Sequence, residues 1–176
     1  MASRPVPLID IIDTGTFDSA WYWLLLLLAW WWSGHRTMGV PHEVMVIAAR
    51  RGGAMAAHVE ALVRAEVARL SAIMRPAGVA LAALGGFVAG LLATAGFWGG
   101  SDFAQGLCLI VLPQLAVTAL HVRLAFRLER APLEGSALHR ALSRQRIWDQ
   151  LVWSAAATVA AALGLLHILP RLFGLG

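Results

Sequence analysis

The chain has 176 residues, a length typical of one compact domain. Hydrophobic residues make up 59% and charged residues 14% of it, and the mean hydropathy is +0.70. Soluble domains average roughly 45–50% apolar and about 25% charged residues. The composition therefore excludes an ordinary soluble protein and predicts a single integral membrane domain over residues 1–176, with the lipid bilayer as its surroundings.

The distribution of the positive charge separates a membrane protein from a nucleic-acid-binding one. The net charge is +4, and all fourteen basic residues are arginines. Twelve of them lie in residues 36–75 and 123–146, between apolar runs. Cytoplasmic loops of membrane proteins concentrate basic residues in this way. Because no basic stripe with interleaved aromatic residues occurs, we expect no nucleic-acid partner.

Four apolar segments predict an all-α polytopic fold with four transmembrane helices, at about residues 17–33, 76–98, 103–124 and 147–169. The first segment is close to the lower limit of about 17 residues for a span. Pro76 fits the start of the second helix, and Pro113 predicts a kink in the third. Before the first span, Pro5–Asp13 is predicted to form a short helix at the membrane surface.

The first and second spans are joined by a predicted amphipathic, cytosolic helical arm over residues 34–75. Gly52 and Gly53 should interrupt this arm, because glycine disfavours helix. Apolar residues recur beyond them at helical spacing, so the arm should lie on the bilayer or hang below it. The stripe consists of Met55, Val59, Leu62, Val63, Val67, Leu70, Ile73 and Met74.

The second arginine-rich segment is a predicted cytosolic loop over residues 125–146, with a short surface helix at Ser136–Arg146. Residues 36–75 and 123–146 hold six arginines each, and the remaining parts hold only Arg4 and Arg171. This asymmetry predicts a multi-pass protein of the bacterial inner (cytoplasmic) membrane with periplasmic N- and C-termini.

Two carboxyl groups in apolar surroundings call for partners. Glu66 falls inside the apolar stripe of the arm, and Arg69 at position i+3 is its nearest candidate, although an arginine of a neighbouring subunit is the alternative. Asp149 stands at the inner end of the fourth span. It is predicted to pair with Arg123 or Arg127 at the same depth.

Small and polar residues inside the spans predict helix–helix contacts. Gly86 and Gly90 form a Gly-x-x-x-Gly motif, which lets a second helix backbone approach closely, in this chain or in another. Gln114 in the third span can donate and accept hydrogen bonds across helices. We expect it to act as a structural contact, with a substrate ligand as the alternative.

The sequence shows no catalytic constellation, nucleotide-binding motif or metal-ligand spacing, so no enzymatic activity and no cofactor are expected. His35 and His121 are the weak candidates for ligands, because both are predicted near the cytosolic interface on different helices. They could hold haem b or a quinone. The preferred interpretation is two interfacial histidines without a ligand.

Several short motifs support a resemblance to a known group of proteins. They are Trp21-Tyr22-Trp23, His35, Gly39-Val40-Pro41 and Ala48-Ala49-Arg50-Arg51-Gly52-Gly53. Together they resemble small alphaproteobacterial membrane proteins often labelled "component of SufBCD complex", mainly over residues 20–75. The resemblance implies a link with iron–sulfur cluster assembly, although the chain has neither a cysteine set nor an ATP-binding element of its own.

These observations together favour a non-enzymatic structural or accessory subunit. Its partner would be another membrane protein complex or further copies of the chain, contacted through small-residue helix faces. The alternative is a small homo-oligomeric channel or transporter with Gln114, His121 and Asp149 along its path.

Overall fold

The computed structural model describes residues 15–172 and consists almost entirely of helices. The surface helix predicted at Pro5–Asp13 lies outside the described residues. In chain order the elements are α2 (Ala20–His35), β1 (Arg36–Thr37), β2 (Val40–Pro41), α3 (His42–Arg51), α4 (Gly53–Ala93), the π-helical turn η1 (Thr94–Trp98), α5 (Asp102–Arg130) and α6 (Gly135–Leu172).

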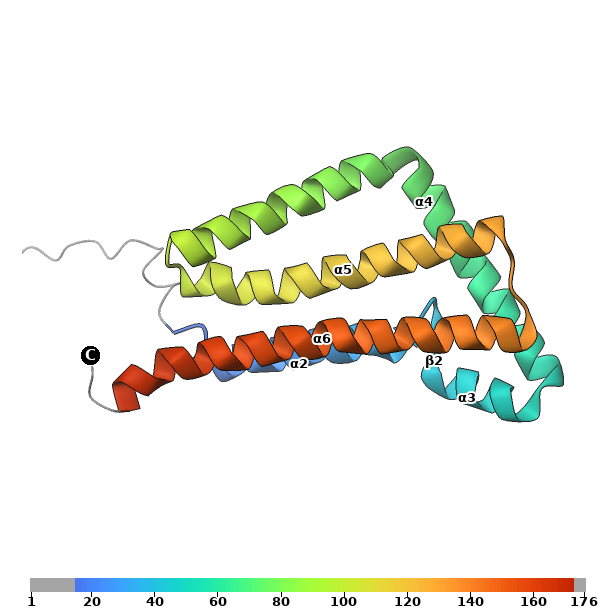
Figure 1. Cartoon of the computed structure of the whole chain (residues 1–176), viewed down its shortest axis with the longest axis horizontal. Helices are drawn as coiled ribbons and strands as arrows, with labels where there is room; N and C mark the ends of the chain where they lie inside the picture. Colours follow the sequence, from blue (N-terminus) through green and yellow to red (C-terminus); the bar gives the residue numbers. More distant parts are fainter. Residues whose placement is uncertain (1–14, 173–176) are drawn as a thin grey trace, which may run out of the picture.

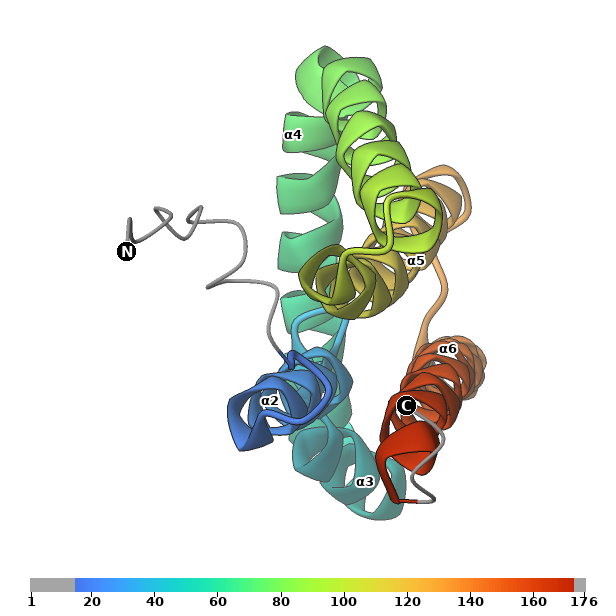
Figure 2. The same cartoon turned by 90° about the vertical axis from the view of Figure 1, so that its left-hand side faces the viewer.

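The helices form a bundle with a crossbar at one end. Helices α2, α5 and α6 run side by side, and the second half of α4 lies along the outer side of α5 (Figure 1). The first half of α4 crosses the end of the bundle, where α3 and the α5–α6 connection also lie (Figures 1 and 2). We call this the arginine-rich end, because residues 36–75 and 125–146 gather there.

The predicted arm and the predicted second span are parts of one helix. Helix α4 continues through Pro76, so the prediction that a new helix starts at this residue is wrong. Figure 1 shows a sharp bend in α4 where the crossbar turns into the long outer segment. A proline inside a helix removes one backbone hydrogen bond and kinks the helix without ending it. The predicted arm and the predicted second span therefore form one continuous, bent helix.

The arm packs against the bundle instead of lying apart from it. Its residues Val59, Val63 and Val67 are buried in a hydrophobic core. That core also contains Leu128 of α5 and Leu142 of α6. The apolar stripe was correctly predicted, and it faces the extended ends of α5 and α6. That the arm lies on the bilayer or hangs below it stays a prediction.

The loop predicted at residues 125–146 is largely helical. Helix α5 continues to Arg130 and α6 begins at Gly135, which leaves residues 131–134 as the connection. The predicted surface helix Ser136–Arg146 is the first part of α6 and continuous with the predicted fourth span. Both helices thus extend beyond the apolar segments and provide the surface on which the arm packs.

A small hairpin, which the sequence did not reveal, follows α2. Strands β1 and β2 pair antiparallel, with Met38 and Gly39 as the two residues of the turn. Both have positive φ, 52° and 74°, as a tight two-residue hairpin requires. The Met38 side chain is buried in the core of the arginine-rich end, which offsets the conformational cost at this residue.

Three helical segments are long and apolar enough to cross a membrane: Gly53–Trp98, Asp102–Arg130 and Gly135–Leu166. Helix α2 has 16 residues and rises about 24 Å, less than the roughly 30 Å of a hydrocarbon core. A second hydrophobic core nevertheless joins α2 to α5 and α6, through residues such as Leu26, Val117 and Trp153. The all-α membrane fold is thus supported for three of the four predicted spans.

Candidate functional site in the polar layer of the bundle

Asp149 is the most buried charged residue in the described part of the chain, at 1% exposed. One of its oxygens lies 2.8 Å from Nε2 of His121 on α5. The other accepts a hydrogen bond of 2.8 Å from the side-chain amide of Gln145, one turn earlier on α6. Buried polar groups are costly without partners, and both carboxyl oxygens have one. This cluster ties α5 to α6.

The predicted pairing of Asp149 with Arg123 or Arg127 is wrong. Among the described residues, the side chains that contact the Asp149 carboxyl group are His121 and Gln145, and both arginines are exposed. The reason is the helical period: Leu124 and Leu128 of α5 face the core, so Arg123 and Arg127 point away from it.

A second polar contact joins α6 to the end of α2. Arg146 donates a hydrogen bond of 3.1 Å from its guanidinium to the backbone carbonyl of Gly34. The last four carbonyls of a helix have no partner within the helix, and a cation near them is favourable. Arg146 therefore holds the C-terminal end of α2 against α6, one helical turn from Asp149.

Beside this contact is a cavity of about 470 Å³ between α2 and α6. The ring of His35 stacks on that of Trp31 there, with centroids 5.2 Å apart. The guanidinium of Arg146 and the amide of Gln150 supply its polar wall. The remaining lining residues are Leu27, Trp30 and Gly34.

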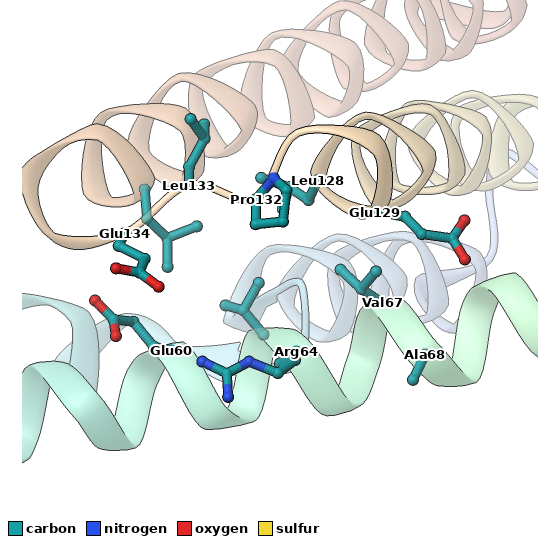
Figure 3. Close-up of a pocket in the computed structure, with 11 residues that line it drawn as sticks. Glu60, Arg64, Val67, Ala68, Leu128, Glu129, Pro132, Leu133 and Glu134 are labelled. Atoms are coloured by element: carbon teal, nitrogen blue, oxygen red, sulfur yellow. The ribbon is translucent and has the colours of Figure 1, made fainter.

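A larger cavity of about 510 Å³ lies at the arginine-rich end, between α4 and the α5–α6 connection (Figure 3). The carboxyl groups of Glu60 and Glu134 approach each other at one side of it, while Glu129 stands at the other (Figure 3). Glu60 also accepts a hydrogen bond of 2.8 Å from the backbone N–H of Gly135. Because the first N–H groups of a helix lack partners, Glu60 caps α6 from a different helix.

The crossbar is held to α5 by a charged cluster beyond the predicted third span. Arg75 of α4 donates to Glu129 at 2.7 Å, and Ser71 donates to the other carboxyl oxygen at 3.1 Å. The hydrogen bond from Arg75 holds the pKa of the Glu129 carboxyl below its ordinary value. Ser71 extends the buried face of Val63 and Val67, so the hydroxyl is placed by the same helical period as the core.

The pairing of Glu66 with Arg69 agrees with the prediction. The two side chains form two hydrogen bonds, the shorter of 2.6 Å. Glu66 also lies against the hairpin, since a Cβ added at Gly39 would stand 3.4 Å from its Cβ. Glu66 thus has its partner within this chain, at the edge of the apolar stripe.

The three predicted helix-contact residues find no close partner in the described chain. A Cβ built at Gly86 or Gly90 would meet nothing within 4 Å. Gln114 is exposed, and within residues 15–172 its side chain takes part in no described hydrogen bond. The observed contact of α4 with α5 instead uses Gly85, where an added Cβ would stand 3.0 Å from Leu115.

The two histidine candidates are placed in different surroundings. His121 is engaged by Asp149, and His35 stacks on Trp31. Residues 15–172 contain no group of three or more His, Cys, Asp or Glu arranged to hold a metal ion. Within this chain each of the two histidines thus has its own side-chain neighbour.

Sequence reasoning missed Gln145, Arg146 and Glu129 as contact residues. A signal for Gln145 was present, because it shares a helical face with Asp149 at i+4. That face also carries Leu138, Leu142 and Trp153, all buried. For Arg146 and Glu129 no signal existed, since their partners lie 112 and 54 residues away in the chain.

Comparison with known proteins assigns this chain to no family. The chain matches no protein-family model, and no curated protein or solved structure matches it. The function is therefore inferred from the geometry of the chain.

Proposed function

We propose that this protein is a non-enzymatic structural or accessory subunit of a bacterial inner membrane, with both termini in the periplasm. It would bind another membrane protein, or a second copy of itself, through one face of α4. The observation that carries this proposal is that Gly86 and Gly90, in the half of α4 after Pro76, are uncovered by the described residues, since a Cβ added at either would meet nothing within 4 Å.

The uncovered face is defined by its small side chains. Ala83, Gly86 and Gly90 follow one another at helical spacing, and all three are exposed. In lipid, where apolar burial gives no driving force, close backbone approach at small residues supplies the packing energy of helix association. The side of α4 that carries Leu84 and Leu91 has the bulky residues suited to lipid contact instead.

The arginine-rich end suits a supporting role. The crossbar is fixed to α5 and α6 by a hydrophobic core and by the Arg75–Glu129 contact. The bend in α4 then projects the membrane half outward along α5 (Figure 2). A partner would thus meet a helix whose base is anchored and whose glycine face is free.

A homo-oligomeric channel or transporter is the second candidate. Its proposed path would use Gln114, His121 and Asp149. Both oxygens of Asp149 are occupied by side chains of this chain, and Gln114 is on an exposed surface. This arrangement favours the accessory role, in which the polar cluster joins α5 to α6.

Native mass spectrometry after gentle extraction from the membrane tests the proposal. We expect the wild-type chain to retain a partner protein or a second copy, and Gly86→Leu or Gly90→Leu to release it. Ala80→Leu is the matched control, because Ala80 is exposed on the side of Leu84 and Leu91. A monomeric wild type, or equal retention by all variants, would contradict the proposed face. A symmetric oligomer that the glycine variants leave intact would favour the channel or transporter, which ion-flux measurements would then test.

A further inference from the structure

We infer that the cavity between α2 and α6 binds the phosphate of an anionic phospholipid, with Arg146 as the principal contact. The inference is independent of the partner face on α4, because the cavity lies between other helices. It rests on charge, on the position of the cavity along the bundle and on the apolar surface that leads to it.

The charge of the cavity suits an anion. Arg146 contributes a guanidinium, of which one nitrogen donates to the carbonyl of Gly34, and the other nitrogens have no hydrogen bond described within residues 15–172. Guanidinium groups offer several N–H donors in a planar arrangement that fits phosphate oxygens. Gln150 adds an amide donor, and none of the described residues that line the cavity is acidic. The nearby carboxyl group of Asp149 has both oxygens engaged elsewhere.

The cavity lies at the level expected of lipid headgroups. It is at the last turn of α2 and beside residues 146–150 of α6, where the arginine-rich and apolar parts of the chain meet. Trp31 is 62% exposed at this level, and tryptophan prefers the membrane interface. Basic pockets between membrane helices at this depth are typical headgroup sites.

An apolar track continues from the cavity toward the middle of the bundle. Leu24, Leu27, Leu28 and Trp31 lie on one side of α2, and all four are exposed. A lipid whose phosphate meets Arg146 could lay an acyl chain along this track. A free phosphate ion would contact only the polar wall formed by Arg146 and Gln150. Replacing Trp31 should therefore weaken the binding of a lipid but not that of a free phosphate ion.

Native mass spectrometry of the full chain with added phosphatidylglycerol or phosphatidylcholine of equal chain length tests the inference. We expect phosphatidylglycerol to be retained more tightly, and Arg146→Gln to weaken its retention about tenfold, as loss of a charge-assisted hydrogen bond does. Trp31→Leu should weaken it less, by removing part of the track. Arg144→Gln is the control, since Arg144 is exposed two residues away and does not line the cavity.

Equal retention of the two lipids, or equal weakening by Arg144→Gln and Arg146→Gln, would overturn the inference. Displacement of phosphatidylglycerol by millimolar inorganic phosphate would identify a phosphate-ion site and overturn the lipid assignment. If Arg146→Gln does not fold, Arg146→Lys and Trp31→Leu decide the matter, because unchanged retention in both would reject the site.

Discussion

His121 on α5 and Asp149 on α6 lie 2.8 Å apart and form the buried contact between the two helices. The histidine side chain is 19% exposed and that of the aspartate 2%. Gln145 completes the cluster from the same helix as Asp149. The partner of Asp149 thus comes from the buried side of α5, and the arginines near it in sequence are not involved.

Replacing Asp149 should destabilise the protein by leaving the buried amide of Gln145 and the partly buried ring of His121 without their partner. We expect Asp149→Ala to lower the free energy of unfolding by roughly 1–3 kcal/mol. A double-mutant cycle with His121→Ala, followed by thermal unfolding in detergent, should show coupling of about 0.5–3 kcal/mol. The same cycle with Arg123→Gln is the control and should show additive effects. Strong coupling to Arg123 would contradict the observed pairing.

Glu60 should stabilise the start of α6 although it belongs to α4. Glu60→Ala removes the acceptor for the N–H of Gly135 and should cost about 0.5–2 kcal/mol, as loss of a helix N-cap does. Glu60→Gln keeps an acceptor oxygen and should cost less. Hydrogen exchange at the first turn of α6 provides the measurement. Equal protection in wild type and Glu60→Ala would show that the cap has no effect there.

The Arg75–Glu129 contact should depend on pH in one direction. The pKa of Glu129 is lowered in the folded protein, so its contribution is present above its ordinary pKa of about 4.3 and is lost as the pH falls through the folded value. We therefore expect Glu129→Gln to be slightly less stable than wild type at neutral pH and equally stable in acid. Unfolding midpoints at several pH values measure this difference. A difference that grows on acidification would reject the assignment.

Gly96 should tolerate no side chain, in contrast to Gly86. A Cβ at Gly96 would stand 2.7 Å from the backbone nitrogen of Gln105, so Gly96→Ala must push η1 away from α5. We expect a loss of about 1–3 kcal/mol in thermal unfolding, typical of overpacking. Gly86→Ala is the matched control and should be close to neutral for folding, because nothing lies within 4 Å. An unchanged midpoint for Gly96→Ala would contradict the described packing of this turn.

Features that depend on local sequence were predicted well. The break at Gly52 and Gly53, the apolar stripe through Val59, Val63 and Val67, and the i,i+3 pair of Glu66 with Arg69 follow from spacing along one helix. Helix period and residue volume suffice for such features, because the groups involved are separated by no more than a few turns.

The continuity of α4 and the hairpin after α2 were not predicted. Pro76 was expected to begin a helix, but α4 continues through it, because a proline inside a helix removes one backbone hydrogen bond and can kink the helix without ending it. The two-residue strands of the hairpin are too short to leave a pattern in the sequence.

The sequence by itself determined the membrane class, the all-helical fold and the concentration of arginine at one end. Those properties depend on composition and on periodicity within single helices. Only the tertiary structure decided that Asp149 faces His121, that Arg146 reaches Gly34 and that the described residues leave Gly86 and Gly90 uncovered. The physical reason is that side-chain partners separated by many residues are chosen by helix rotation and register. These are set by the packing of the two hydrophobic cores as a whole.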